Sequence, residues 1–286
     1  MPARKRPFHR GFGVALALVS GLAVPGCARR GPRLAGGADA AAVLPAPAAD
    51  AGGVPVALTV VSYNMLWKRA GSTASMAALR AAGADIAVLQ EMTPAWERAL
   101  RAGLGDLYPH MRFNAARAGG VAVLSRWPLD EPRLLPAPRW FPALRVLART
   151  PDGPVQVVAL HLRPPRLDRT RPLQVLAEIA AARRAEVEAY WKALDPALPT
   201  LIAGDFNETA GDSAVRFLGA QGLTSALTDP AVATWRGDGS QPGLGVQFDH
   251  VLFDRHFAAV SARVIDGGDS DHVPLVAALA RVAAQP

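Results

Sequence analysis

Residues 199–207 have the sequence PTLIAGDFN, an apolar stretch that ends on two polar side chains. The run 199–205 has the composition of a buried strand, in which successive side chains point to opposite faces. Asp205 and Asn207 are then expected on one face, while Phe206 points into the core. A carboxylate beside an amide can activate a water molecule and orient the phosphate oxygens that it attacks. The alternative is a Gly-Asp turn closed by an Asx hydrogen bond.

Polar side chains also lie at the ends of other apolar stretches. Asn64, Glu91 and His161 each end one, and two later stretches carry their polar groups near the start. Strands of this kind can bring such groups to one rim of a sheet, where we expect the site. The expected strands are 58–64, 85–91, 120–125, 144–149, 155–161, 199–205, 247–253 and 272–278, and the expected helices are 72–82, 93–104, 172–194 and 213–222.

Asn64 and Glu91 offer hard oxygen ligands with a low total charge. Mg²⁺ binds ligands of this type in proteins while it keeps several of its waters. Each residue taken alone is also typical of a solvated strand end or a helix cap. Together they are candidate ligands of a divalent cation.

Two histidines have a chemical context in the sequence. Asp271 precedes His272, and Asp249 begins a nearby strand; an aspartate beside an imidazole orients it and favours its charged form. His161 follows the alternating residues of its strand, so the alternative for it is a half-buried structural histidine. His110, His250 and His256 are expected to be structural or exposed.

Several enzyme classes lack their motifs in this chain. There is no Gly-rich phosphate-binding loop, no His-Glu-x-x-His helix and no Gly-x-Ser-x-Gly elbow. Their absence argues against nucleotide kinases, zinc proteases and serine hydrolases. A single Cys excludes a disulfide scaffold and a cysteine-rich zinc cluster.

Six short segments share their order and spacing with a known family. They are Ser62-Tyr63-Asn64, Leu89-Gln90-Glu91, His161-Leu162, Gly204-Asp205-Phe206-Asn207, Asp249-His250-Val251 and Ser270-Asp271-His272. Together they resemble the endonuclease/exonuclease/phosphatase family, from Leu58 to about Leu279. The resemblance implies an α+β fold, a four-layer α/β/β/α sandwich of two packed mixed β-sheets with helices on the outer faces. It also implies phosphoester hydrolysis by direct attack of water.

The resemblance further implies a divalent-metal site at one end of the sandwich. Asn64 and Glu91 would hold Mg²⁺ (or Mn²⁺). Asp271 matches a position near the second histidine that a second metal can share.

The remaining polar positions are assigned to the reaction by the same resemblance. Asp205 would activate or position the attacking water, and Asn207 would contact the phosphate. His161 and His272 would flank the phosphate, with Asp249 paired to His272. The identity of the general base stays open, since either Asp205 or the Asp249–His272 pair could take that role. A metal and two imidazoles would offset charge on the phosphoryl oxygens.

The charge balance does not indicate a dedicated DNA-binding protein. The formal net charge is +7, but four basic residues lie in the first 26, which contain no acid. From residue 54 onward there are 24 basic and 22 acidic residues, so little electrostatic excess remains for a polyanion. A nuclease without special affinity for DNA stays compatible with this composition.

The substrate is open among three interpretations. The first is a nuclease-like phosphodiesterase acting on DNA or RNA. The second is a phospholipid phosphodiesterase of the sphingomyelinase type or an inositol-phosphate phosphatase. The third is a surface lipoprotein that keeps the fold only to bind, against which the full set of metal, acid and histidine positions argues.

Trp140 and Phe141 lie between prolines in an expected loop. They are candidate substrate contacts, because such rings can stack on bases or dip into a lipid surface. The alternative is a loop that packs its own aromatic side chains.

Residues 1–26 have the layout of an export signal. A basic start is followed by the apolar stretch Gly11–Val24, which is too short to span a bilayer. Leu22–Cys27 resembles a lipobox, which would place a lipid anchor on Cys27. Pro25 departs from the usual pattern, so ordinary cleavage or a free thiol at that cysteine stays open.

Residues 27–53 are rich in Ala, Gly and Pro and indicate a flexible tether. Residues 54–286 show no internal repeat or second linker, so one domain is expected there. We expect an exported monomer, either a cell-envelope lipoprotein held to the membrane through Cys27 or a secreted protein.

Overall fold

The computed structural model describes residues 55–165, 170–237 and 245–282. Within them the chain forms two six-stranded β-sheets, four α-helices and one short 3-10 helix. The expected leader and tether, with Cys27, lie outside the described residues. In the described part of the chain, no helix combines the length and the apolar character needed to cross a bilayer.

Each sheet has one parallel pair of strands near its centre and antiparallel neighbours around it. In pairing order, the first sheet contains β11 (Phe257–Val264), β12 (Leu275–Arg281), β1 (Leu58–Asn64), β2 (Ile86–Gln90), β4 (Val121–Ser125) and β3 (His110–Asn114). The second contains β5 (Leu129–Leu135), β6 (Ala143–Thr150), β7 (Gly153–His161), β8 (Thr200–Asp205), β10 (Asp249–Phe253) and β9 (Thr224–Ser225). The parallel pairs are β1 with β2 and β7 with β8, so both sheets are mixed, as expected.

The two sheets pack face to face through alternate residues of their strands. In β1, Val60 belongs to the cluster between the sheets, while Val61 and Tyr63 belong to the cluster under the helices. In β8, Leu201 lies between the sheets and Ile202 lies under the helices. Because such strands are buried on both faces, they need the continuous apolar runs that the sequence contains.

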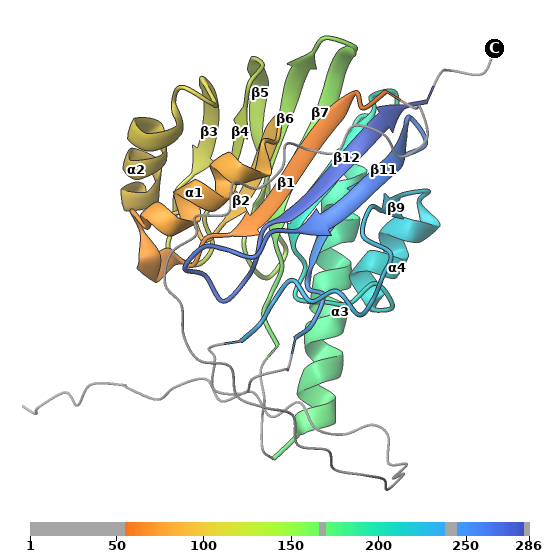
Figure 1. Ribbon diagram of the computed structural model, residues 1–286. Coiled ribbons are helices and arrows are strands. Elements are labelled where there is room, and N and C mark those ends of the chain that lie inside the picture. The colour runs from red at the N-terminus through yellow and green to blue at the C-terminus, as the bar shows by residue number, and fades with distance from the viewer. Residues whose placement is uncertain (1–54, 166–169, 238–244, 283–286) are drawn as a thin grey trace, which may run out of the picture. The chain divides into compact units, whose positions relative to one another are not determined.

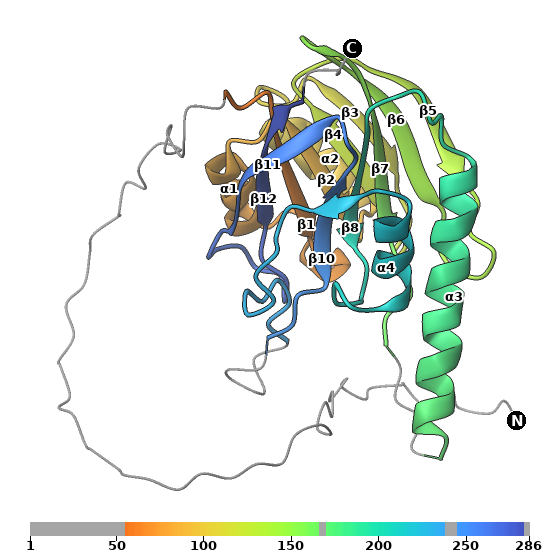
Figure 2. The same cartoon turned by 90° about the vertical axis from the view of Figure 1, so that its right-hand side faces the viewer.

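Helices cover the outer face of each sheet (Figures 1 and 2). They are α1 (Thr73–Ala82), α2 (Pro94–Leu104), α3 (Pro172–Lys192) and α4 (Ser213–Ala220), and the 3-10 helix is η1 (Trp67–Arg69). α1 and α2 pack on the first sheet through residues that include Leu79 and Trp96, and α3 packs on the second through Tyr190. This confirms the four-layer α/β/β/α sandwich.

The expected helices are present with ends shifted by a residue or two. Ser72 and Thr93 act as N-caps, since each side-chain oxygen accepts a backbone N–H at 3.1 Å from the third residue on. The expected strand 272–278 starts later, at Leu275. His272 instead forms an isolated bridge with Trp235.

Strands β1, β7 and β8 all finish at one end of the sandwich, which we call the site end. Asn64 is the last residue of β1, and the register sets His161 of β7 beside Asp205 of β8. β10 runs the opposite way and starts at Asp249, across from Asp205. Asn64 Nδ2 donates a 3.1 Å hydrogen bond to Asp205 Oδ2, so the two sheets meet here. In Figure 1 this is the lower end, toward which β1 runs.

Candidate active site

Three polar side chains form a row across neighbouring strands of the second sheet. The register places His161, Asp205 and Asp249 side by side at the ends of β7, β8 and β10. Each continues the alternation that points toward the other sheet, as Leu201 and Ala203 do in β8. The apolar core between the sheets therefore ends in a polar row at the site end.

Asp205 is the centre of this row and is only 1% exposed. Its Oδ1 accepts a hydrogen bond from Asn207 N at 2.8 Å. Its Oδ2 lies 3.1 Å from Asn64 Nδ2, 3.4 Å from His161 Nε2 and 3.5 Å from His272 Nε2. The Asx hydrogen bond is thus present, but it uses one oxygen and leaves the other for the site.

Asn207 does not continue the extended strand as the alternation predicts. β8 ends at Asp205, and Asn207 has a left-handed φ of 52°. This turn directs Asn207 Nδ2 to the carbonyl of Leu162 at 3.0 Å, while Phe206 remains fully buried. The amide still lies beside Asp205, held by a turn rather than by strand geometry.

Gly204 permits the close approach of β7 and β8 just before the site. Its φ is +151°, and a Cβ at this position would lie 2.0 Å from the carbonyl oxygen of Leu160. Only glycine fits such a contact. The small residue therefore allows Asp205 to sit directly beside His161.

Asp249 and His272 form a buried pair. His272 Nδ1 lies 2.7 Å from Asp249 Oδ2 and donates to it. Thr234 Oγ1 accepts the backbone N–H of Asp249 at 2.9 Å and that of Phe248 at 3.0 Å, which fixes the start of β10. Asp249 Oδ1 is buried and has no hydrogen-bond partner among the described residues.

The surrounding charges keep His272 protonated. Burial alone would lower the pKa of His272, but the carboxylates of Asp249 and Asp205 outweigh it and raise the pKa to about 10. The imidazolium therefore presents Nε2–H toward Asp205 at neutral pH. A group that reaches this position meets a fixed positive charge.

His161 is held from the opposite side. Its Nδ1 donates a 2.8 Å hydrogen bond to the carbonyl of Ala118, so its Nε2 faces Asp205. The Phe141 ring centroid lies 5.9 Å from the imidazole centroid. The two histidines thus approach one carboxylate oxygen from β7 and from the chain before β12.

Glu91 and Asn64 lie together at the ends of the parallel pair β1 and β2. Asn64 Nδ2 lies 3.4 Å from Glu91 Oε1, and Trp67 N donates to Glu91 Oε2 at 2.9 Å. Strand alternation alone would turn Glu91 toward the helices, as it turns Leu89. A left-handed φ of 63° at Glu91 interrupts that alternation.

Asp271 is linked to the same region through its neighbour Ser270. Ser270 Oγ donates a 2.6 Å hydrogen bond to the backbone carbonyl of Asn64. Asp271 Oδ2 accepts the indole N–H of Trp235 at 3.3 Å. The structure therefore brings all eight predicted metal and reaction residues to the site end.

These side chains fit a hard divalent cation. Glu91 and Asp271 are half-exposed carboxylates, and each of their oxygens accepts one hydrogen bond within the described residues, so lone pairs remain for a metal. A second group, which the sequence does not single out as metal ligands, places one ligand atom each from Asp205, Asp249 and His272 within 4.8 Å of one another. The donor set is rich in oxygen, as Mg²⁺ and Mn²⁺ prefer.

Phe141 lies beside His161, and Trp140 and Phe141 are both half-buried. The backbone carbonyl of Phe141 accepts a 2.6 Å hydrogen bond from the hydroxyl of Tyr190 in α3. The Phe141 ring covers Gly119, where an added Cβ would lie 2.2 Å from the ring. Phe141 therefore packs back onto the domain, which is the alternative expected for this loop. Trp140 contacts it with the ring centroids 4.5 Å apart and the ring planes tilted by 47°.

The sequence does not predict the roles of three residues that shape the site. Thr234 positions Asp249, the carbonyl of Ala118 orients His161, and Ser270 ties the last segment to β1. Ser270 stands in one of the six family-like segments, whereas Thr234 lies in none of them. A backbone carbonyl such as that of Ala118 leaves no signature in the residue type.

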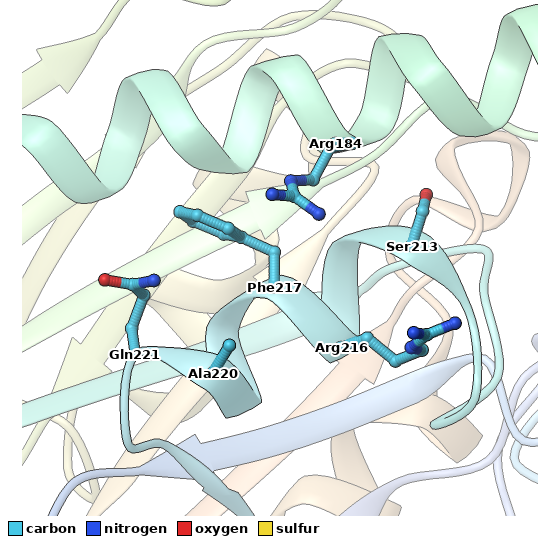
Figure 3. Close-up of a pocket in the computed structure, with 6 residues that line it drawn as sticks. All are labelled: Arg184, Ser213, Arg216, Phe217, Ala220 and Gln221. Atoms are coloured by element: carbon cyan, nitrogen blue, oxygen red, sulfur yellow. The ribbon is translucent and has the colours of Figure 1, made fainter.

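A cavity of about 340 Å³ lies elsewhere, in the outer helical layer (Figure 3). It opens between α3 and α4, where Arg184 lies 4.4 Å over the ring of Phe217. Its lining residues are Arg184, Ser213, Arg216, Phe217, Ala220 and Gln221. None of the acids, amides or histidines of the site contributes to it.

Comparisons with known proteins agree with this geometry. A model of the Endonuclease/Exonuclease/phosphatase family matches residues 61–272. Curated protein sequences give no significant match.

Solved structures share the fold. An endonuclease/exonuclease/phosphatase from Beutenbergia cavernae has a TM-score of 0.61 and 21% identity, covering 78% of this chain and 71% of that chain. An endonuclease/exonuclease/phosphatase family protein from Bacteroides thetaiotaomicron has a TM-score of 0.62 and 16% identity, covering 79% and 98%. Sphingomyelinase C from Streptomyces griseocarneus has a TM-score of 0.55 and 19% identity, covering 78% and 99%.

The family match covers well over half of the chain, from the first sheet to the second histidine of the site. It includes every predicted metal and reaction residue. The chain therefore belongs to the endonuclease/exonuclease/phosphatase family and is a phosphoester hydrolase.

Proposed function

We propose that this protein is an exported, divalent-metal-dependent phosphodiesterase that cleaves DNA or RNA by direct attack of water. One observation carries the proposal. A single carboxylate oxygen, Asp205 Oδ2, lies within 3.5 Å of Asn64 Nδ2, His161 Nε2 and His272 Nε2. An anionic base between an amide and two imidazoles is suited to holding a water molecule against a phosphate.

In this mechanism Asp205 is the general base. His272 is a poor acceptor because its Nε2 already carries a proton at neutral pH, as its pKa of about 10 requires. Its charge instead stabilises a phosphoryl oxygen as negative charge develops there. Asp249 keeps His272 charged and oriented through the 2.7 Å contact.

His161 and Asn207 complete the phosphate contacts. His161 offers Nε2, because its Nδ1 is committed to the carbonyl of Ala118. Asn207 keeps a second Nδ2–H, which can donate to a phosphate oxygen, after the first has donated to the carbonyl of Leu162. Both residues lie next to the carboxylate of Asp205, so the phosphate that they bind is held close to the water that Asp205 activates.

Glu91, Asn64 and Asp271 are the residues that would hold the metal. When bound, a divalent cation supplies Lewis-acid stabilisation of charge on the phosphate oxygens. Mg²⁺ and Mn²⁺ are the ions that suit these oxygen ligands.

The proposal is tested by nicking of supercoiled plasmid with Mg²⁺ or with EDTA. Wild-type protein should nick the plasmid only with the metal, and Asp205→Ala should lose about 10³-fold or more in rate. Asp205→Asn retains an oxygen that can accept from Asn207 N and isolates the loss of charge. Circular dichroism must show that both variants are folded. Nicking that persists at the wild-type rate in Asp205→Ala contradicts the assignment.

A phospholipid phosphodiesterase is the second candidate function. Sphingomyelinase C shares the fold, and Trp140 adjoins the site in a loop that could meet a lipid surface. Metal-dependent release of headgroup from sphingomyelin vesicles, without nicking of plasmid, would favour this function over the nuclease. Release of phosphate from inositol phosphates is measured in the same experiment, because an inositol-phosphate phosphatase belongs to this second candidate function.

We further propose export, with acylation of Cys27. The support is the basic start, the apolar stretch of residues 11–24 and the lipobox-like Leu22–Cys27. Mass spectrometry of membrane-extracted protein should find a mature terminus at Cys27 that carries a lipid. An unmodified terminus elsewhere would remove the lipoprotein proposal and leave the activity untouched.

A further inference from the structure

The loops at the site end differ sharply in charge. Over the residues that the structure describes, four of them carry basic residues and no acid, namely 65–72, 115–120, 136–142 and 162–165, which we call the basic loops. Two carry acids and no basic residue, namely 206–212 and 265–271, which we call the acidic loops. The nearly balanced charge of the whole domain conceals this separation.

The sheet order places three of the basic loops at one side of the site end. β3 and β4 at one edge of the first sheet contact β5 and β6 at the edge of the second. Loops 115–120 and 136–142 connect those strands, and 162–165 leaves the neighbouring β7. Loop 265–271 instead leads into β12, at the other side of the first sheet, where the remaining basic loop 65–72 contacts it through the hydrogen bond from Ser72 to Asp269. The charge therefore changes sign between loops 115–120, 136–142 and 162–165 on one side and loop 265–271 on the other.

The basic loops present cations that no carboxylate neutralises. Within the described residues, Lys68, Arg69, Arg117 and Arg139 are exposed and form no ion pair. On the acidic side the charges are partly engaged, since Asp266 pairs with Arg236. The acidic loops also use Asp269 and Asp212 as acceptors for Ser72 and Thr209. Unpaired positive charge thus lies on the basic loops, with Arg117 and Arg139 on the side away from the acidic loop 265–271.

Two cations near the site are supported by tryptophan rings. Lys68 Nζ lies 5.3 Å from the ring centroid of Trp67, and Arg163 Cζ lies 5.4 Å from that of Trp140. A ring face holds a cation in place and lowers the entropy lost when that cation meets an anion. Arg163 follows His161 by two residues, so it extends the site toward the basic loops.

We propose that the basic loops bind the phosphate backbone of a DNA strand and lead it to Asp205. The inference rests on the proposed function and deepens it, because it specifies the side on which the polymer lies. A strand of phosphates gains from unpaired cations spaced along one side and is repelled by the acidic loops. A single headgroup needs no such extended charge.

The test measures the salt dependence of DNA binding by the full chain in EDTA, with a fluorescent 20-base-pair duplex. Arg117→Ala/Arg139→Ala removes two cations from the basic loops. Lys192→Ala/Arg255→Ala removes the same charge from exposed sites at the far end of the sandwich. Each phosphate contact in duplex DNA contributes about 0.9 to the slope of log K against log salt concentration. The first variant should lower the slope by about 1.8 and weaken binding by roughly tenfold per cation at 0.1 M salt.

Equal slopes for the two double variants and the wild type would overturn the proposal. So would a variant of the basic loops that loses binding to phosphatidylserine vesicles while DNA binding is retained, since the partner would then be a membrane. Plasmid nicking tests the nuclease activity separately from the binding path of the DNA. Metal-dependent nicking with unchanged slopes would support the nuclease activity and contradict only the binding of DNA along the basic loops.

Discussion

His272 Nδ1 lies 2.7 Å from Asp249 Oδ2, and the Nε2 of the same ring lies 3.5 Å from Asp205 Oδ2. One imidazolium thus bridges two carboxylates that are themselves paired in register on neighbouring strands. Like charges so close together would repel each other in a buried site without a cation between them. The pair of Asp249 and His272 therefore stabilises the reactive geometry around Asp205 as well as supplying positive charge.

Asp249→Asn should lower kcat by about 10²- to 10⁴-fold while the protein remains folded. The amide keeps the shape of the side chain but removes the charge that holds His272 as an imidazolium. NMR titration should show the pKa of His272 falling from about 10, beside the measured loss of kcat.

A second aspartate–histidine pair in the same chain provides the matched control. Asp254 contacts His256 Nδ1 at 3.0 Å beyond the end of β10, away from the site. Asp254→Asn should leave kcat near the wild-type value. If it lowers kcat as much as Asp249→Asn does, the site-specific role of Asp249 is wrong.

Glu91→Gln should raise the Mg²⁺ concentration needed for half-maximal activity by about tenfold or more, since a neutral amide is a weaker ligand than a carboxylate. Titration of activity with Mg²⁺ measures the shift. Glu97→Gln is the control, because Glu97 lies on α2 and pairs with Arg101 at 2.8 Å. A Mg²⁺ requirement unchanged in Glu91→Gln would argue that other residues hold the ion.

The site could be predicted largely because its members lie at strand ends and on the side of each strand that faces the other sheet. His161, Asp205 and Asp249 each continue the inward-facing set of residues in their strand. A polar residue at the end of an apolar run, or at its start in the antiparallel β10, therefore marks the rim. Glu91 obeys no such rule, since its placement depends on a left-handed φ. Its position at the end of an apolar run indicated the rim, and the resemblance to the family supported it, but strand alternation did not.

The strands that the sequence does not predict are those at the edges. β5 carries Pro132 and an irregular register between Asp130 and Arg133, and most of its residues are not buried. β11 is half-exposed along most of its length, and β9 has two residues. Edge strands bury one face or neither, so they lack the continuous apolar run that identifies a central strand.

Glu186 in α3 should make the stability of the protein depend on pH. It is fully buried, and neither carboxylate oxygen has a hydrogen-bond partner among the described residues. Burial raises the pKa of Glu186 from 4.5 to about 7, although Arg163 and Arg183 oppose the shift. The folded protein therefore binds this proton more tightly than the unfolded chain does. The associated stability is fully present below pH 4.5 and is lost as the pH rises through about 7.

Glu186→Gln removes that ionisation, so it should raise the free energy of unfolding at pH 8 by roughly 2 kcal/mol and have little effect at pH 5. Urea unfolding at the two pH values measures both numbers. Glu188→Gln, on the solvent side of the same helix, should give no such difference. Equal effects of Glu186→Gln at pH 5 and pH 8 would show that the carboxyl is not protonated in the folded protein.

Gly119→Ala should lower kcat by about 10- to 100-fold through displacement of His161. A Cβ at Gly119 would lie 2.2 Å from the Phe141 ring, which must then move. That ring borders His161, whose Nδ1 is bonded to the carbonyl of Ala118, directly before the substituted residue. Both supports of the imidazole are thus disturbed by one methyl group. Gly211→Ala is the control, since a Cβ there meets open space; comparison of kcat and Tm for the two variants decides the prediction, and an unchanged kcat in folded Gly119→Ala would refute it.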